Sequence, residues 1–190
     1  MSAEQMRADE QAKYAAAYHD PAYRMGDARR GPLRHWLLQL AAPGLSYIDV
    51  GCGRGESLNI ARSVGLTDVR GAEVVHYLCG AAVLQMPGVH ALPLPDASVD
   101  LVTCLDVLEH VHEPDAIAGL AELVRVTRRR LLVSVAWFAS MHRGVDLHIT
   151  KHDAIWWLRH LQRVAPKAMP WAPAEVFQKP KTAWFEVVKA

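Results

Sequence analysis

The stretch YIDVGCGRGESL, from Tyr47 to Leu58, places three glycines on alternate positions directly after a run typical of a buried strand. Glycines between a strand and a helix let the backbone approach a ligand closely, and the helix N-terminus offers unpaired N–H groups. In the dinucleotide fingerprint G-x-G-x-x-G the third glycine would stand at Glu56. Since Glu56 would put a carboxylate beside a pyrophosphate, the loop favours a nucleotide-like ligand with a zwitterionic amino-acid tail.

Two acidic residues near the loop support a nucleotide-like ligand. Glu73 closes the next strand-like run, twenty residues after Gly53, a position from which a carboxylate accepts both hydroxyls of a ribose. The alternative for Glu73 is an exposed acid at a strand end. Asp49 lies inside the first strand, where an unpaired charge would be costly. We expect Asp49 to hold a donor, either loop N–H groups or a ligand ammonium.

The hydrophobic pattern changes at Ser46 from helical spacing to alternating strand-like and helix-like runs. The pattern of residues 1–45 predicts two helices around a turn. The second helix carries a stripe of apolar residues that we expect to pack in the core. Strands are expected over 46–50, 68–74, 98–107 and 130–137 and near Val89, and helices over 56–64, 75–84, 114–126 and 150–161. Two strand-like runs, 174–177 and 182–188, follow. This alternation predicts a mainly parallel, Rossmann-like, doubly wound α/β sheet with a C-terminal β-hairpin.

Length and charge narrow the class of protein. The 190 residues fit one domain, with 1–45 as a helical lid and 46–190 as a catalytic core. The 21 basic and 20 acidic residues do not call for nucleic acid, and we interpret Arg128–Arg130 as a solvated helix end. Without a signal-peptide pattern or a run long enough to span a bilayer, we expect a soluble, cytoplasmic protein. Three cysteines without a C-x-x-C pair indicate reduced thiols.

Four segments occur in order along the chain: YIDVGCGRGESL, GAEVV, ALPLPDASVDLVTCLDVLEHV and ELVRVTRRRLLVSV. In this order and spacing they resemble the successive motifs of class I S-adenosylmethionine-dependent methyltransferases, of the methyltransferase domain 11 type. The resemblance implies a seven-stranded sheet and S-adenosyl-L-methionine as the cofactor. It also implies the residues around that cofactor: Asp49, Gly51, Cys52 and Gly53 for the methionine part, Glu73 with Val74 for the ribose, and Leu94, Asp106, Val107 and Leu108 for the remaining wall.

The chain departs from this family at the position that reads adenine. Family members usually carry an acidic residue a few positions before the LP segment, where MPGVHALPLP has Gly88. Adenine recognition must then rest on backbone groups or on His90, and weaker cofactor affinity is one consequence.

Candidate catalytic groups gather in DVLEHVHEPD and in the later loop FASMHRGVDLHIT. Methyl transfer from a sulfonium needs positioning, and it needs a base only where the acceptor carries a proton. His110 is the first candidate for that base, with a structural, helix-capping histidine as the alternative, and His148 is the second. Together with Asp106 and Glu109 they also resemble a metal-holding arrangement of some family branches. Because Asp replaces the usual Glu at the first position, we expect no metal.

The N-terminal segment YAAAYHDPAYRMGDARR is interpreted as the lid. Its tyrosine and arginine side chains suit covering the cofactor and pairing with its carboxylate, and Tyr14, Tyr18 and Arg24 are the candidates. Tyr23, Arg29 and Arg30 lie in the same segment. The alternative is an amphipathic helix that merely packs on the sheet.

These observations predict a methyltransferase that acts on a hydroxyl or amine of a small-molecule or glycan-like acceptor. A nucleic-acid methyltransferase is the alternative enzyme, which the balanced charge makes less favourable. The alternative that is not an enzyme is a non-catalytic subunit, which binds the cofactor as the partner of another enzyme. No residue pattern names the acceptor or the oligomeric state.

Overall fold

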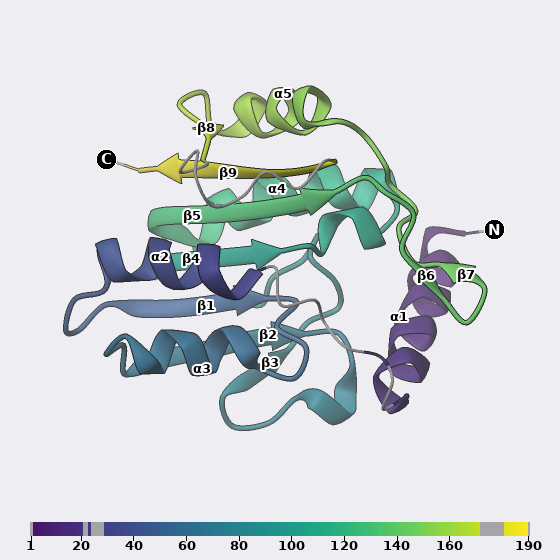
Figure 1. The fold of residues 1–190 in the computed structure, drawn as a ribbon, viewed down its shortest axis with the longest axis horizontal. Coiled ribbons are helices and arrows are strands. Elements are labelled where there is room, and N and C mark those ends of the chain that lie inside the picture. Colours follow the sequence, from purple (N-terminus) through teal and green to yellow (C-terminus); the bar gives the residue numbers. More distant parts are fainter. Residues whose placement is uncertain (1, 21–22, 24–28, 172–180, 190) are drawn as a thin grey trace.

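The computed structural model describes residues 2–20, 23, 29–171 and 181–189, and its centre is a seven-stranded sheet of order β3-β2-β1-β4-β5-β9-β8 (Figure 1). The five strands from β3 to β5 are parallel, and β9 and β8 run antiparallel to their neighbours. The strands are β1 (Ser46–Val50), β2 (Asp68–Glu73), β3 (Val83–Gln85), β4 (Val99–Leu105), β5 (Thr127–Ala136), β8 (Met169–Pro170) and β9 (Thr182–Val188). The predicted Rossmann-like α/β class is therefore confirmed.

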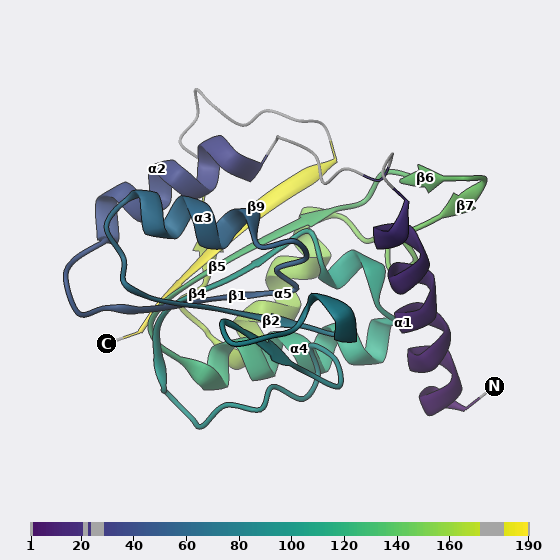
Figure 2. The ribbon, with the colours of Figure 1, turned by 90° about the horizontal axis from the view of Figure 1, so that it is seen from below.

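Helices cover both faces of the sheet, as Figure 2 shows. On one face lie α2 (Arg30–Leu40) and α3 (Glu56–Ser63), and on the other lie α4 (Glu113–Val126) and α5 (Ala154–Val164). The spacing of apolar residues explains this, because Trp36 and Leu37 of α2 and Trp157 and Leu161 of α5 fall on one stripe of each helix and are buried. The predicted core role of the α2 stripe is confirmed.

The first helix has a different place. Helix α1 (Ala3–His19) lies across the carboxyl ends of the parallel strands, next to a small hairpin formed by β6 (Met141–His142) and β7 (Val145–Asp146) (Figure 1). Only Ala17 and Tyr18 of its seventeen residues are buried. Of the 1–45 segment, α1 therefore covers the edge of the sheet where ligands bind in open α/β folds, and α2 belongs to the helical layers.

Two predicted elements differ from the structure. The helix expected over 75–84 is wrong: a short 3₁₀ turn, η2 (His76–Leu78), leads instead into β3, whose residues pair with Gly71–Glu73 of β2. The strand expected near Val89 is wrong too, since that segment is a turn. A three-residue edge strand depends on pairing with β2, which local periodicity does not reveal. The run expected over 174–177 lies outside the described residues.

The basic run Arg128–Arg130 is also corrected, because it lies inside β5 rather than at a helix end. Arg128 and Arg129 form ion pairs with the buried Asp100 of β4, and Arg130 pairs with Glu186 of β9. These arginines therefore link neighbouring strands at the end of the sheet opposite to α1, and they are not a solvated helix end.

Candidate cofactor and acceptor site

The glycine loop joins β1 to α3 through three residues in the left-handed region. The φ angles of Gly51, Gly53 and Gly55 are 76°, 52° and 78°, values that residues with a Cβ adopt only at a cost. A Cβ atom on Gly51 would also lie 2.5 Å from Cγ2 of Val107, which follows β4. The loop therefore requires glycine at Gly51 both for its backbone conformation and for its close approach to the β4 end.

Glu73 ends β2 beneath this loop and is 4 % exposed. Its Oε2 accepts a hydrogen bond from the Gly53 N–H at 2.8 Å, and its Oε1 accepts from the Val74 and Val75 N–H groups at 2.8 and 3.1 Å. Burial raises the pKa of Glu73, although these three N–H groups oppose the shift. A carboxylate offers about four acceptor positions, so capacity for a ligand hydroxyl remains. Its ribose contact stays a prediction.

Asp49 is buried in β1 and holds donors, as expected, but the donors are side-chain hydroxyls. Its Oδ1 accepts from Thr103 Oγ1 at 2.6 Å, and its Oδ2 accepts from Ser57 Oγ. Burial raises the pKa of Asp49 to about 6 despite these two hydrogen bonds. Asp49 therefore ties the first turn of α3 to β1 and β4, and its contacts in this structure do not include loop N–H groups.

A cavity of about 610 Å³, partly open to solvent, lies between the strand ends and α1. The strand ends and the loops that follow them contribute Gly51, Glu73, Val74, Met86, Gly88, Val89, Asp106, Val107, His110 and Val111, and the N-terminal segment contributes Tyr14, Tyr18, Tyr23 and Arg29. The structure thus brings together predicted residues from the ends of β1, β2 and β4 and two of the predicted lid tyrosines.

Asp106 lies in the cavity wall directly after β4. Its φ angle is 52°, and its Oδ1 accepts from Ser134 Oγ at 2.5 Å. Arg29 approaches from the N-terminal segment, with its Nε 3.1 Å from Asp106 Oδ2 and one guanidinium N–H donated to the Leu105 carbonyl. Arg29 therefore places a cation at the end of β4. It belongs to the predicted lid segment, although it was not among the residues predicted to bind the cofactor.

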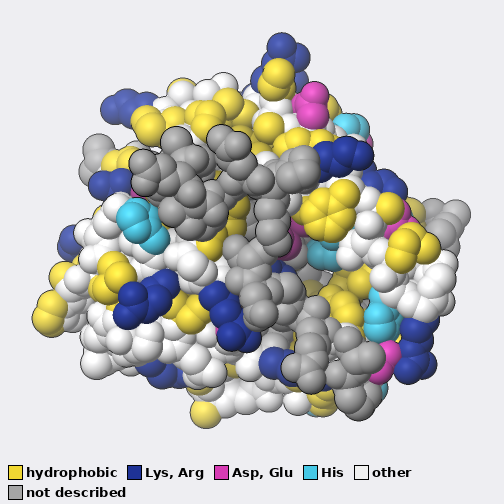
Figure 3. Space-filling view, viewed as in Figure 1, with side chains coloured by type: hydrophobic (Ala, Val, Ile, Leu, Met, Phe, Trp, Pro, Cys, Tyr) yellow, Lys and Arg dark blue, Asp and Glu magenta, His cyan; other side chains and the backbone are white. Residues whose placement is uncertain are grey.

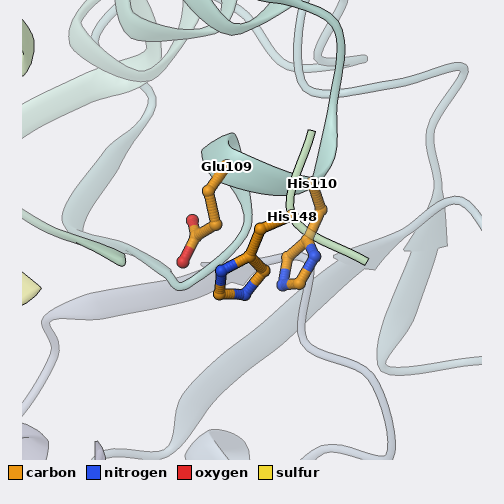
Figure 4. Close-up of side chains that lie close together, drawn as sticks. All are labelled: Glu109, His110 and His148. Atoms are coloured by element: carbon orange, nitrogen blue, oxygen red, sulfur yellow. The ribbon is translucent and has the colours of Figure 1, made fainter. Parts of the chain in front are cut away.

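Three side chains converge beside the cavity, as Figure 4 shows for Glu109, His110 and His148. One potential ligand atom from each lies within 4.8 Å of the others, and the two imidazole centroids are 4.5 Å apart. Glu109 and His110 belong to the 3₁₀ turn η3 (Leu108–His110), and His148 follows β7. The two predicted catalytic histidines are therefore neighbours, although they are 38 positions apart in the chain (148 − 110).

Each imidazole is oriented by a polar contact on one nitrogen. His110 Nδ1 contacts the Tyr14 hydroxyl and lies 3.1 Å from the Leu147 carbonyl oxygen, and His148 Nδ1 lies 2.8 Å from the Phe138 carbonyl oxygen. Burial, with His148 next to it, lowers the pKa of His110 to about 3, and burial also lowers the pKa of His148. Both rings are therefore neutral near pH 7.

In the sequence, Glu109 was predicted only as one member of a possible metal-holding group. It is 0 % exposed, its Oε1 accepts from the Ala136 N–H at 2.9 Å, and its Oε2 has no hydrogen-bond partner among the described residues. Burial, with the Asp106 charge adding to it, raises the pKa of Glu109 well above its usual range. An unsatisfied buried carboxylate oxygen is costly, so Glu109 has unused capacity toward a proton or a cation.

Among the described residues, the four-ligand arrangement that included Asp106 is not formed. The converging group consists of Glu109, His110 and His148, whereas the Asp106 carboxylate is engaged by Ser134 and Arg29. Two imidazoles and one carboxylate suit a transition metal better than magnesium, which prefers oxygen ligands.

The remaining predicted residues lie near the cavity or apart from it. Gly53 contacts Glu73, and Cys52 is buried beneath the loop, where burial raises the pKa of its thiol. Leu94 does not line the described cavity wall: it packs against the core, and its carbonyl accepts from Arg125. Arg24 lies outside the described residues.

Comparison with known proteins agrees with this architecture. Residues 48–132 match the family model described as a methyltransferase domain. The matched segment runs from β1 into β5 and therefore includes the strand ends that line the cavity. Over residues 48–132 the chain is therefore similar to this methyltransferase domain family.

Individual relatives are more distant. The chain is 33% identical over 139 residues to the ubiquinone biosynthesis O-methyltransferase of Hahella chejuensis, covering 58% of this chain and 55% of that protein. It thus spans about half the length of that curated relative. Its fold resembles magnesium protoporphyrin IX methyltransferase from Synechocystis PCC 6803 with bound S-adenosylmethionine (TM-score 0.66, 20% identity, 100% and 98% of the two chains). It also resembles Burkholderia thailandensis 1,6-didemethyltoxoflavin-N1-methyltransferase (TM-score 0.67, 18% identity, 98% and 89%).

Proposed function

We propose that the protein transfers a methyl group from S-adenosylmethionine to a hydroxyl or amine of a small-molecule or glycan-like acceptor. The observation that carries this proposal is the single cavity in which Gly51, Glu73 and Asp106, from three strand ends, face His110 and the tyrosines of α1. When bound, the cofactor supplies an electrophilic methyl group on a sulfonium. The chain then has to bind, orient and exclude water, which supplies much of the acceleration in such displacements.

The individual residues suit separate parts of this task. The loop N–H groups and Glu73 suit the amino-acid and ribose parts of the cofactor, and Arg29 offers a cation for a carboxylate. His110 is the residue we assign to the acceptor proton, because its neutral ring lines the cavity and contacts Tyr14 of the lid. In this structure the Tyr14 hydroxyl occupies the hydrogen-bonding position on His110 Nδ1 that the hydroxyl of an acceptor would need.

Calorimetric titration of the purified protein with S-adenosylmethionine and with S-adenosylhomocysteine tests the cofactor. We expect saturable binding of both, and no binding at millimolar ligand would end the proposal. Product nucleoside formation across a pool of phenols, sugars, amines and carboxylates then tests turnover. Binding without turnover on any acceptor would favour the alternative of a non-catalytic subunit.

A metal-assisted version of the same reaction is a second candidate, and the unpartnered Glu109 Oε2 is the observation that favours it. A divalent ion held by Glu109, His110 and His148 would lower the pKa of an acceptor hydroxyl. We keep the metal-free version, because one free carboxylate oxygen and two imidazoles offer a hard ion few oxygen ligands. Turnover is therefore expected to survive exhaustive chelation, and loss of turnover with recovery on adding Mn²⁺ would favour the metal.

Nucleic acid is the less favoured acceptor. On the described part of the face shown in Figure 3, the Lys and Arg side chains are separated by hydrophobic and uncharged surface and form no continuous stripe. A groove that binds along a nucleic-acid phosphate backbone needs such a basic stripe. No helix among the described residues has both the length and the apolar character needed to cross a bilayer.

A further inference from the structure

The space beside Gly88 is filled by another residue's side chain. A Cβ atom on Gly88 would lie 2.6 Å from Nδ1 and 2.7 Å from Cε1 of His90, closer than such atoms approach one another. The imidazole of His90 therefore occupies the volume that a side chain at position 88 would take. A side chain at 88 and the present position of the His90 ring exclude each other.

The His90 ring faces a fixed carboxylate. Its Nδ1 lies 3.9 Å from Oδ2 of Asp115, in the first turn of α4, and both side chains are mostly buried. The two oxygens of Asp115 accept from Nε and Nη2 of Arg7 in α1, each at 2.7 Å. A separation of 3.9 Å is too long for a hydrogen bond between His90 and Asp115. Both atoms therefore keep acceptor capacity toward the space next to them, if the neutral imidazole carries its proton on Nε2.

That space adjoins the cavity at the strand ends. A second cavity of about 460 Å³, lined by His90, Asp115 and Arg7 among others, shares a wall with the first. The shared residues are Tyr14, Val74, Gly88, Val89, His110 and Val111. If the ribose lies at Glu73 and the methionine part at Gly51, the base must extend away from the glycine loop, toward the turn after β3. The valines of the shared wall suit the faces of a planar base, and Gly88 lies at its edge.

We infer that His90 and Asp115 read the 6-amino group of the cofactor's adenine, in the space that a side chain at position 88 would otherwise fill. An exocyclic amino group has two N–H donors, and the two acceptor atoms, 3.9 Å apart, are spaced to receive them together. This inference rests on the proposed cofactor, and it goes beyond it by naming the residues that distinguish adenine from a 6-oxo purine.

The arrangement also couples base recognition to the lid. Asp115 receives the Arg7 guanidinium through two hydrogen bonds, so the same carboxylate contacts α1 and faces the base. Binding of the amino group and closure of the N-terminal half of α1 therefore stabilise one arrangement of Asp115.

The test compares two ligands by calorimetry: S-adenosylhomocysteine and S-inosylhomocysteine, in which a 6-oxo group replaces the 6-amino donor. The wild-type protein is expected to prefer the adenine compound by about tenfold or more, as one to two hydrogen bonds imply. In His90→Ala that preference should shrink to about twofold or less. His76→Ala is the matched control, because His76 contacts Gln85 on the exposed surface after β2 and should leave the preference unchanged.

A second variant guards against an unspecific effect of His90→Ala. In the double variant G88D/H90A the removed ring leaves room for a carboxylate at 88, and the preference for adenine should return. If His90→Ala keeps the wild-type preference, or if the wild type shows none, the inference is overturned while the cofactor proposal stands. If the wild-type protein binds neither compound, the cofactor proposal fails and this inference falls with it.

Discussion

Gly51 shows how a single backbone position shapes the cavity. Its φ of 76° and the 2.5 Å approach of a hypothetical Cβ to Val107 are two separate demands for glycine. Gly44 offers a natural comparison, because its φ is 82° but nothing lies within 4 Å of its hypothetical Cβ. The pair therefore separates the cost of a left-handed backbone from the cost of a clash.

We expect Gly44→Ala to lower the free energy of unfolding by about 1–2 kcal/mol, the cost of a left-handed residue with a Cβ. Gly51→Ala should cost about 1–3 kcal/mol more, since Val107 must also move, and it should weaken cofactor binding at least about tenfold. Urea unfolding and calorimetry measure both effects. Equal losses in the two variants, with cofactor affinity retained in both, would show that Val107 moves aside freely.

His110 carries the prediction about the acceptor proton. If it is the general base, His110→Ala should lower kcat by about 10²- to 10⁴-fold and leave cofactor affinity nearly intact. Since its pKa is lowered to about 3, the ring stays neutral from about pH 5 to 8, and its protonation should not reduce kcat in that range. His152→Ala, a surface histidine paired with Glu113, is the control. Wild-type turnover in His110→Ala would leave positioning alone as the source of acceleration.

Glu109 predicts a pH-dependent change in stability. Burial raises its folded-state pKa above the unfolded value, so the native state binds an extra proton between those two values and stability falls as pH rises through that window. Glu109→Gln cannot ionise and lacks this loss. The variant should therefore compare more favourably with the wild type at pH 8 than at pH 4 in urea unfolding. A difference that does not change with pH would mean that Glu109 does not titrate this way.

At the scale of elements, α1 is attached differently from the other helices. It buries only Ala17 and Tyr18, and polar contacts hold it along its length. Arg7 pairs with Asp115, Gln11 donates to the Val74 carbonyl, and at the far end Arg143 of the β6–β7 hairpin pairs with Asp20 at 2.7 Å. Such a helix contributes little to the core and can open to admit ligands.

Arg143→Ala tests this attachment. Because Arg143 is exposed, the loss in free energy of unfolding should stay below about 1 kcal/mol. Hydrogen exchange of the α1 amides should nevertheless speed up, as the last turn is released from the hairpin. Arg70→Ala, which removes an exposed pair with Asp68 far from α1, is the control. Unchanged exchange in α1 would show that its other contacts suffice to hold it closed.

At the scale of the whole molecule, the sheet order places the cavity. The chain moves outward from β1 to β2 and β3, then returns to the other side of β1 with β4. The loops after β1 and β4 therefore diverge to opposite faces and leave a crevice between them, as in other open α/β sheets. Gly51 and Asp106 meet at this crevice, and α1 closes it from the outside (Figures 1 and 2).

Binding to this crevice should stabilise the native state as a unit. With free S-adenosylhomocysteine at one hundred times its Kd, linkage gives ~2.7 kcal/mol. For a chain of this size each kcal/mol corresponds to roughly 2–4 °C in Tm, so a rise of about 5–10 °C is expected by thermal unfolding. Methionine alone is the control ligand and should shift Tm far less. A Tm independent of the nucleoside at saturating concentration would contradict a site formed by the folded state.

Local pattern alone determined the strand β1, the glycine loop, helix α3, strand β4 and helix α4, because each depends on periodicity or on turn residues close in sequence. The same pattern placed Glu73 at the end of β2 and His110 beside the end of β4. These features share one property: the residues that define them are neighbours along the chain. The departure at Gly88, with His90 as a replacement for the missing side chain, came instead from the resemblance to the methyltransferase family.

Only the tertiary structure decided the rest, because the interactions join residues far apart in sequence. The edge strand β3 forms because it pairs with β2, and Arg128–Arg130 lie in a strand because β5 pairs with β4. Asp49 accepts a hydrogen bond from Thr103 rather than from loop N–H groups. Glu109 is buried with one carboxylate oxygen unpaired among the described residues, and Asp115 faces His90. Burial and long-range partners shift the pKa of Asp49, Glu109 and Asp115, and these shifts cannot be predicted from periodicity.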